Sequence, residues 1–495
     1  MGSGCGKGLY QRNSLRLKNT IFNIINYGKI VDMKKLKNSS YKNNKETTFF
    51  GFLYRVLIVL LYKIGFKNLG EEIIAGYKDP KDFKKIEVFE ERFINNLVGF
   101  HFFYPYRKMK IIGVTGTNGK TTTATLLYKI ATSLGYKAGL IGTNGHIIIK
   151  KEIPTDPFTS TTPSALLLNK FLSEMKKEGC EYVFMEVSSH GLEEKRVAGI
   201  KFFGTIFTNL THDHLDYHKN IDNYFLAKRK LFKNLSSSAF ALSNIDDNYG
   251  NAIVNEIKAK KFFYGFGDKS EYIDFYGKIL KLNFEGLELD FNGEMIKSKL
   301  LGKFNAYNLL AVWSISKLLN FNTKQVNKIL ETIEPPRGRF EHFVSKDGVV
   351  VIVDYAHSPD SLEKILLTVK DIKPEGGRVI SVFGCGGDRD SSKRPKMGKI
   401  GASLSDIAIF TSDNPRSEDP NKIIEQMKDN LTHEENQKVV TIADRRLAIE
   451  ESAELAQKGD IILCAGKGHE DYQEVNGIKT HFDDFEEYKK VLDRV

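Results

Sequence analysis

The stretch GVTGTNGKTTTATLL, residues 113–127, indicates the fold class of this chain. It places an apolar strand, a glycine-rich turn and a helix start in direct succession, which is typical of α/β proteins. Glycines let the backbone approach a ligand closely, and the N–H groups at a helix start carry partial positive charge. The stretch therefore predicts a polyphosphate-binding loop at the first strand of an α/β domain.

The predicted phosphate-contacting residues run through this loop into the first turn of the helix. They are Gly116, Thr117, Asn118, Gly119, Lys120, Thr121 and Thr122. We expect Lys120 to reach the β- and γ-phosphates and the Thr121 hydroxyl to ligate Mg²⁺. A strict G-x-x-x-x-G-K-[ST] loop would need glycine where this chain has Val114, so the spacing indicates a variant of the common nucleotide-hydrolase loop.

Apolar runs that end in small or polar residues recur along the chain, with helical patterns between them. These runs are 109–116, 181–187, 202–209, 349–355, 378–384, 406–412 and 460–466. Buried parallel strands explain them best. Tandem prolines in ETIEPPRGRFE, 331–341, end a helix and mark a boundary. We expect three domains: an atypical N-terminal region, 1–108, a central domain with a mostly parallel sheet, 109–334, and a C-terminal Rossmann-like domain, 335–495.

Composition limits the functional classes. The chain has 495 residues, 41% of them hydrophobic, and a net charge of +11. The charge fits either a nucleic-acid-binding protein or a lysine-rich surface around an enzyme for anionic substrates. Dispersed lysines and the lack of any nucleic-acid-binding motif favour the enzyme. Four scattered cysteines without metal or redox spacing indicate a reducing cytoplasm.

One apolar segment lies outside the predicted sheets. GFLYRVLIVLLYKIGF, residues 51–66, carries Arg55 and Lys63 and is shorter than the roughly 20 residues that a bilayer span needs. We interpret it as a buried or partner-facing helix, with a membrane-surface helix as the alternative. No transmembrane segment and no secretory signal are predicted.

Polar side chains follow two further apolar runs. Glu186 lies at the end of FMEV, and TNLTHDHLDYH, 208–218, supplies histidines and aspartates after the next run. The carboxyl ends of parallel strands meet at one edge of a sheet. We therefore expect Glu186 and His214 to form a Mg²⁺ site beside the phosphate loop. Zinc is disfavoured because no cysteine lies nearby and oxygen ligands dominate.

Three polar loops follow C-terminal strands: VFGCGGDRDSSKRPKMG, 382–398, TSDNPRSEDP, 411–420, and AGKGHEDYQ, 465–473. Together they can form one pocket for a zwitterionic amino acid. Arg389 and Arg416 can fork a carboxylate, whereas Glu470 can hold an ammonium group.

The loop TGTNGKTT resembles that of the Mur ligases and of their relatives, the folylpolyglutamate synthetases. These enzymes use ATP to join a carboxylate to an amine. The resemblance implies a metal held by Glu186 and His214, and a carbamylated Lys228, in AKRKLF, that helps hold a second Mg²⁺. It also implies contacts of Asn305, in GKFN, with the adenine side of ATP, and of Arg339 and Asp354 with phosphate and ribose.

The C-terminal loops resemble those of the MurE branch, which adds the third residue to UDP-N-acetylmuramoyl-L-alanyl-D-glutamate. In that branch Asp-Asn-Pro-Arg is typical of meso-diaminopimelate selection, because the arginine contacts a distal carboxylate that lysine lacks. The residues that the resemblance assigns to substrate are Thr161, Thr162, Ser188, Arg196, Arg389, Asp413, Asn414, Arg416, Gly466 and Glu470. Its catalytic set is Lys120, Glu186, His214 and Lys228.

The expected activity is ATP-dependent amide formation through an acyl phosphate, adding meso-diaminopimelate or L-lysine to a nucleotide-linked cell-wall peptide precursor. The resemblance covers residues 109–495, and the D-S-R-x-V-x-x-G-x-L-F uridine-nucleotide strip of the branch is missing. A pseudomurein-type ligase on another carrier is therefore an alternative, as are a folylpolyglutamate synthetase and a nucleic-acid-stimulated ATPase. We expect a monomer with no nucleic-acid partner.

Overall fold

The computed structural model describes residues 105–153, 161–211, 213–267 and 272–492. All of them belong to one compact unit, residues 98–495. Residues 1–104, with the apolar segment 51–66, lie outside the described residues, as do residues 154–160, which precede the predicted substrate residues Thr161 and Thr162. The fold is described from the short 3-10 helix η1 (Pro105–Lys108) onward.

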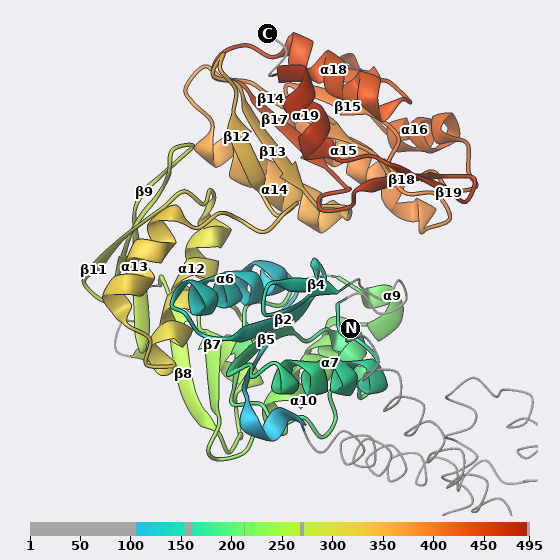
Figure 1. The fold of residues 1–495 in the computed structure, drawn as a ribbon. Helices are drawn as coiled ribbons and strands as arrows, with labels where there is room; N and C mark the ends of the chain where they lie inside the picture. The colour runs from blue at the N-terminus through green and yellow to red at the C-terminus, as the bar shows by residue number, and fades with distance from the viewer. Residues whose placement is uncertain (1–104, 154–160, 212, 268–271, 493–495) are drawn as a thin grey trace, which may run out of the picture. The chain divides into compact units, whose positions relative to one another are not determined.

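Eleven strands of the described chain form one large sheet, in the order β11-β10-β9-β8-β7-β6-β1-β5-β2-β3-β4 (Figure 1). The strands from β9 to β2 in this order run parallel, whereas β3, β4, β10 and β11 join through antiparallel pairs. In chain order the strands are β1 (Lys110–Thr115), β2 (Ala138–Gly142), β3 (Gly145–Ile148), β4 (Lys151–Ile153), β5 (Tyr182–Glu186), β6 (Gly204–Phe207), β7 (Phe240–Asn244), β8 (Lys260–Gly265), β9 (Phe275–Asn283), β10 (Gly286–Phe291) and β11 (Glu294–Ser298).

Helices cover both faces of this sheet, which explains why its central strands are apolar without alternation. One core cluster joins the sheet to α6 (Lys120–Ser133), α12 (Lys303–Leu318) and α13 (Thr323–Thr332). A second cluster, on the other face, joins it to α7 (Ala165–Lys177) and α10 (Ile221–Lys233). Figure 1 shows α6 and α12 on one side of the strands and α7 and α10 on the other.

Short helices fill the remaining connections of this part of the chain. They are α8 (Ser189–Glu193), α9 (Leu215–His218) and α11 (Gly250–Ile253). The first two follow β5 and β6 directly, so both lie where strands end.

A second sheet of six strands has the order β12-β13-β17-β14-β15-β16. Its pairs are parallel except for the edge pair β12–β13. Its strands are β12 (Glu341–Val344), β13 (Val350–Asp354), β14 (Val379–Phe383), β15 (Ile407–Phe410), β16 (Val439–Thr441) and β17 (Ile461–Ala465). The hairpin β18 (Tyr472–Val475) and β19 (Ile478–His481) forms a separate two-stranded sheet.

Helices also cover both faces of the second sheet. One core contains residues of α14 (Pro359–Ile372), α15 (Arg394–Leu404) and α16 (Pro420–Lys428). The other contains residues of α18 (Arg445–Leu455) and α19 (Asp484–Leu492). The short helix α17 (His433–Gln437) precedes β16. Strands inside two helical layers form a doubly wound sheet, in which ligands bind at the carboxyl ends of the strands.

The predicted α/β class is confirmed, with a mostly parallel first sheet and a second C-terminal sheet. The antiparallel additions β3–β4 and β10–β11 and the β18–β19 hairpin were not predicted from the sequence. Among the described residues, no helix combines the length and the apolar character that crossing a membrane requires.

Packing between α15 and α16 depends on a glycine. A Cβ on Gly398 would lie 1.8 Å from the carbonyl oxygen of Met427, a backbone atom that cannot rotate away. We expect Gly398→Ala to lower the free energy of unfolding by about 1–3 kcal/mol, the typical cost of overpacking. Exposed Lys399 on the same helix provides the matched control, and Lys399→Ala should change stability by less than about 0.5 kcal/mol. Urea denaturation measures both, and equal midpoints would contradict this packing.

Candidate functional site

The loop between β1 and α6 lies tightly against its neighbours. A Cβ on Gly116 would lie 1.8 Å from Thr208 Oγ1, and one on Gly119 would lie 2.5 Å from Asn308 Oδ1. Gly119 also caps α6 in a left-handed conformation, with φ 82°. Only glycine satisfies both demands, so these residues fix the path of the loop into the helix.

Two of the loop amides are used within the protein. Thr117 N donates to Asn209 O at 2.8 Å, and Asn118 N donates to Asn209 Oδ1 at 2.9 Å. The helical ladder begins with Thr123 N donating to Gly119 O. The N–H groups of residues 119–122 precede that first bond and have no helical acceptor. The amides suited to a phosphate are therefore those of residues 119–122, while Thr117 and Asn118 hold the loop to the end of β6.

Lys120 extends back over this loop. Its Nζ donates to Gly116 O at 3.0 Å and to Thr117 O at 2.7 Å. Burial lowers the pKa of Lys120, and the carboxylate of Glu186 opposes that shift. The ammonium group thus lies beside the open amides, where an anionic phosphate would compensate its lost hydration.

Glu186 joins three segments at the end of β5. Its Oε2 accepts from Thr121 Oγ1 at 2.9 Å and from Thr143 Oγ1 at 3.2 Å, and its Oε1 accepts from Thr143 N at 2.8 Å. Thr143 Oγ1 lies 3.1 Å from Thr161 Oγ1. The carboxylate is 1% exposed. The buried acid thereby ties the first turn of α6 to the loop after β2.

Lys228 on α10 is the second buried cation of the site. Its Nζ donates to Gly116 O at 2.7 Å and lies 4.3 Å from the centre of the Tyr224 ring. Burial, reinforced by Lys120, lowers the pKa of Lys228 well below its usual range. A larger share of this amine is therefore neutral, which is the nucleophilic form.

His214 follows β6 with a left-handed backbone, φ 53°. Its ring lies 5.1 Å from that of His190 and 6.1 Å from that of Tyr224. Loss of water around the ring, with Lys120 nearby, lowers the pKa of His214 to about 4, against the opposing charge of Asp213. The imidazole is neutral near pH 7 and has a lone pair available for a ligand.

The side chains present suit Mg²⁺ only in part. Within the described residues, no three His, Cys, Asp or Glu side chains form a metal-binding group. The predicted set contains one carboxylate, one hydroxyl, one imidazole and one lysine, and Thr121 and Glu186 are in direct contact. Mg²⁺ commonly completes its ligands with phosphate oxygens and water. The oxygens of Thr121 and Glu186 fit such an ion, and Lys228 would fit only as a carbamate.

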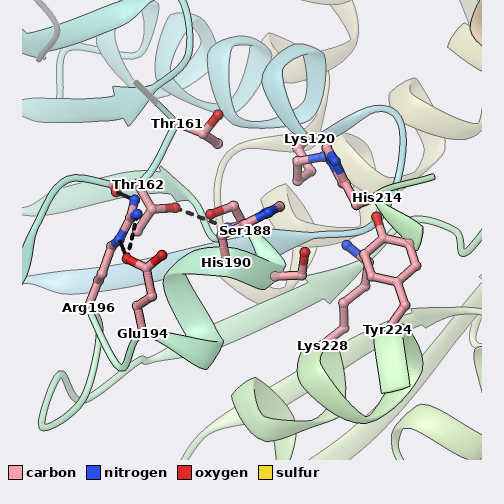
Figure 2. Close-up of a pocket in the computed structure, with 11 residues that line it drawn as sticks. Lys120, Thr161, Thr162, Ser188, His190, Glu194, Arg196, His214, Tyr224 and Lys228 are labelled. Carbon is pink, nitrogen blue, oxygen red and sulfur yellow. Dashed lines mark hydrogen bonds and ion pairs between the residues drawn. The ribbon is translucent and has the colours of Figure 1, made fainter. Parts of the chain in front are cut away.

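A pocket of about 370 Å³ opens beside these residues (Figure 2). It is lined by Lys120, Thr161, Thr162, Ser188, Ser189, His190, Glu194, Arg196, His214, Tyr224 and Lys228. The structure therefore brings the predicted catalytic residues Lys120, His214 and Lys228 together with the predicted substrate residues Thr161, Thr162, Ser188 and Arg196.

Hydrogen bonds connect the predicted substrate residues on one wall of this pocket. Thr162 Oγ1 donates to Glu186 O and accepts from Ser188 N, both at 3.0 Å. Arg196 Nη1 donates to Thr162 O at 2.7 Å, and its other edge contacts Glu194 at 2.6 Å. Because Arg196 is held at both edges, its guanidinium has a fixed orientation at the pocket wall (Figure 2).

Asn305 is buried beneath the phosphate loop. Its Nδ2 donates to Leu301 O at 2.9 Å, and its Oδ1 accepts from Asn308 Nδ2 at 3.0 Å. Asn308 in turn approaches Gly119. Both functions of the Asn305 amide are therefore used within the protein.

Arg339 and Asp354 lie together at the end of β13. Asp354 accepts from Phe340 N and Ala356 N, both at 2.8 Å. Burial raises the pKa of Asp354 to about 6, against the charge of Arg339. The guanidinium carbon of Arg339 lies 4.9 Å from the centre of the Tyr355 ring.

The three predicted amino-acid loops meet at the carboxyl ends of β14, β15 and β17. Asn414 Nδ2 donates to Glu470 Oε2 at 2.8 Å, and a Cβ on Gly466 would lie 2.9 Å from Asp413 Oδ2. Arg416 Nη1 donates to Gly387 O at 2.8 Å, which adds the loop after β14. The structure thus places Asp413, Asn414, Arg416, Gly466 and Glu470 in one cluster.

Arg389 lies on the loop after β14, beside Gly386. Its side chain is exposed, and no described residue accepts a hydrogen bond from it. Arg389 and Arg416 both approach Gly386: a Cβ there would lie 3.0 Å from Arg416 Nη1 and 3.7 Å from Arg389 Cγ. The fork of the two arginines on a carboxylate stays a prediction.

A buried lysine balances the acids of the cluster. Lys467 is fully buried, with its Nζ 3.3 Å from Asn414 Oδ1 and 3.6 Å from Glu470 Oε2. Burial raises the pKa of Glu470, further raised by Asp413 and opposed by Lys467. The carboxylates of Asp413 and Glu470 therefore share the cluster with two cations, Lys467 and Arg416.

Comparisons with known proteins agree with this arrangement. The model of the Mur ligase middle domain matches residues 114–315, and that of the Mur ligase glutamate ligase domain matches residues 338–468. The UDP-N-acetylmuramoyl-L-alanyl-D-glutamate–2,6-diaminopimelate ligase of Phocaeicola vulgatus is 49% identical over 388 residues, covering 78% of this chain and 79% of its own.

The chain belongs to the Mur ligase family. The ligase of the same name from Clostridium tetani is 38% identical and covers 97% of this chain and 99% of its own. That alignment includes most of residues 1–108, for which the motifs gave no resemblance. The recognition of a Mur ligase from the sequence is confirmed.

Solved structures show how far the Mur ligase likeness extends. A structure of a ligase with the same name has 33% identity and a TM-score of 0.60, covering 81% of this chain and 82% of its own. A pseudomurein peptide ligase from Methanothermus fervidus has 19% identity and a TM-score of 0.52, covering 73% of this chain and 76% of its own, which shows a shared fold alone.

The sequence analysis did not identify several residues that support the phosphate pocket and the amino-acid loops. Thr143, Asn209 and Asn308 hold Glu186, the loop amides and Gly119, and Lys467 lies among the amino-acid loops. The glycine-flanked GTNG at 142–145 and the second asparagine of FNAYN were available signals. Because the residues that they contact lie far away in the sequence, no local sequence pattern predicted these contacts.

The close approach of Gly119 to Asn308 generates a prediction. We expect Gly119→Ala to weaken Mg-ADP binding at least about tenfold, because the methyl group would displace the amides of residues 119–122. Gly135→Ala is the matched control: Gly135 also has a positive φ, 90°, but no atom lies within 4 Å of its Cβ position. Isothermal titration calorimetry measures both variants, and equal affinities would show that the contact is irrelevant to the nucleotide.

Proposed function

We propose that this Mur ligase joins the carboxylate of a nucleotide-linked cell-wall peptide precursor to the amine of meso-diaminopimelate, using ATP. The observation that carries the proposal is the gathering of Arg416, Asp413 and Glu470 in one cluster at the ends of three strands. That cluster offers the Arg416 guanidinium to a carboxylate, and the carboxylates of Asp413 and Glu470 to an ammonium group.

The charges favour diaminopimelate over lysine. Arg416 retains a guanidinium that can bind a distal carboxylate, which lysine does not possess. Beside an amine that lacks this carboxylate, the guanidinium would gain no partner from the substrate. The relatives from Phocaeicola vulgatus and Clostridium tetani carry the name of a diaminopimelate ligase, which supports the same choice.

We propose UDP-N-acetylmuramoyl-L-alanyl-D-glutamate as the acceptor, in keeping with the names of those relatives. Full-length similarity to the Clostridium tetani ligase supports a related N-terminal region. The pseudomurein and folylpolyglutamate ligases among the similar structures are less than 20% identical, which supports a common fold and nothing about substrate.

The proposed reaction has two steps. The acceptor carboxylate attacks the γ-phosphorus of ATP, which releases ADP and leaves an acyl phosphate. The amine of diaminopimelate then attacks the acyl carbon, loses a proton, and expels phosphate to leave the amide. Fixing the reactants in register can supply on the order of 7–11 kcal/mol of the barrier.

The chain contributes positive charge and orientation to the first step. Lys120 and the amides of residues 119–122 would bind the phosphates, while Arg196 and Thr162 would orient the acceptor at the opposite wall of the pocket. Thr121 and Glu186 would hold Mg²⁺, and Mg²⁺ neutralises charge on phosphate oxygens. Asp354 and Arg339 would contact the nucleotide, whereas Asn305 would act from beneath the loop.

Lys228 is proposed to carry a carbamate. Carbon dioxide adds only to a neutral amine, and burial beside Lys120 favours that form of Lys228. The modification would turn a cation into an anion with two oxygen ligands, so Lys228 would then help to hold a second Mg²⁺, while His214 would join Glu186 at the first.

We propose domain boundaries near residues 108 and 335, as the sequence predicts. A monomeric state and a cytoplasmic location stay predictions from the sequence.

The proposed function is tested by offering ATP, Mg²⁺ and the acceptor with diaminopimelate, lysine, ornithine or alanine, and measuring the product by mass spectrometry. We expect an amide product with diaminopimelate and little with the other amines. Replacing the acceptor by a folate or by RNA should leave ATP unconsumed, and turnover with either would contradict the proposal.

Lys120→Ala separates chemistry from folding in this assay. Loss of the ammonium should lower turnover by at least about a hundredfold, the scale of one electrostatic group at a transition state. Lys129→Ala, on the same helix but outside the pocket, should retain activity. Thermal melts should show that both variants remain folded.

A further inference from the structure

The β18–β19 hairpin, labelled in Figure 1, is joined to Arg416 by backbone hydrogen bonds. Arg416 N donates to Glu474 O at 3.1 Å, and Asn476 N donates to Arg416 O at 2.7 Å. These two bonds form an isolated parallel bridge between Arg416 and Val475. Both backbone polar groups of Arg416 are thus held by the hairpin.

The backbone of Arg416 needs such support. Its φ of 52° is in the left-handed region, which a non-glycine residue adopts at a cost. Glu474 N donates to Asn414 Oδ1 at 2.9 Å, and Gln473 Nε2 donates to Asp413 O at 2.8 Å. Strand β18 therefore bonds to this segment at Asp413, Asn414 and Arg416.

The side chain of Glu474 extends the same contact to the guanidinium. Its Oε2 lies 3.8 Å from Arg416 Nε, and both side chains are about one-fifth exposed, at 23% and 22%. On the other edge, Arg416 Nη1 donates to Gly387 O at 2.8 Å. Among the described residues, no acceptor takes a hydrogen bond from Arg416 Nη2.

This arrangement restricts a flexible side chain. Arginine loses about 2 kcal/mol of rotamer freedom when it is fixed, and a side chain fixed before binding does not pay that cost again on binding. Glu474 attracts one nitrogen at a long distance, so it orients the guanidinium without occupying the fork that a carboxylate would take.

We propose that Glu474 is a specificity-determining positioning residue, which holds Arg416 ready for the distal carboxylate of the incoming amine. This inference rests on the proposed function, in which Arg416 binds that carboxylate. Glu474 acts through Arg416 and has no role in the chemistry of the phosphate pocket. Its effect should therefore depend on the amine and vanish when Arg416 is absent.

A double-mutant cycle tests this dependence. We expect Glu474→Gln to raise the KM for diaminopimelate about three- to fivefold, the scale of one partly exposed ion pair. The kcat and the KM for ATP should stay unchanged, and kcat/KM for lysine should not fall. In the Arg416→Ala background, adding Glu474→Gln should have no further effect on diaminopimelate.

Glu486→Gln is the matched control, because Glu486 pairs with His481 on the outer strand of the same hairpin at 2.9 Å. Glu486→Gln should leave kcat, the KM for diaminopimelate and the KM for ATP unchanged. An unchanged or lower KM for diaminopimelate in Glu474→Gln would overturn the inference. So would an equal loss of kcat/KM with lysine. The inference would also fail if Glu474→Gln had the same effect in the Arg416→Ala background. Failure of the unmodified enzyme with every amine would instead refute the proposed function.

Discussion

The buried carboxylate of Glu186 is the contact on which the phosphate pocket depends. It accepts from Thr121 at the start of α6 and from the backbone and hydroxyl of Thr143 after β2. A Cβ on Gly142 would lie 2.3 Å from its Oε1, so a glycine is needed there to admit the acid. An almost fully buried acid is tolerated only when its lone pairs are satisfied, and here the groups that satisfy it come from separate strand ends.

The same pocket brings together the amines of two buried lysines, Lys120 and Lys228. Lys120 and Lys228 both donate to Gly116 O, and burial lowers the pKa of each. Two desolvated amines beside open helix amides are unfavourable alone and favourable around a polyphosphate. The pocket therefore favours anions. The cluster at the second sheet offers groups of both signs, with Asp413 and Glu470 beside Lys467 and Arg416.

Much of the fold and of the site follows from the sequence because the informative features are local. Unbroken apolar runs predicted the parallel strands, and glycine-rich or charged loops after them predicted Lys120, Glu186, His214 and the Asp413–Arg416 segment. Parallel strands align their carboxyl ends, so the position of a loop along the chain also indicated where it lies in the sheet.

The contacts that the sequence did not predict join residues that lie far apart along the chain. Asn308 approaches Gly119 across nearly 190 positions, and Glu474 joins Arg416 through a hairpin whose outer strand is exposed and weakly apolar. Arg389 matched the expected motif, but its side chain is exposed and has no hydrogen-bond acceptor among the described residues, so its role stays a prediction. Sequence pattern indicates which residue types are present, whereas hydrogen-bond partners and side-chain directions are fixed by packing.

The transfer of phosphate to the acceptor carboxylate is the central claim, and isotope transfer tests it most directly. An acceptor labelled with oxygen-18 in its reacting carboxylate would be converted with ATP and diaminopimelate, and the released phosphate analysed by mass spectrometry. Attack of the carboxylate on the γ-phosphorus predicts that each phosphate carries one labelled oxygen. Unlabelled phosphate, released together with amide product, would contradict the account.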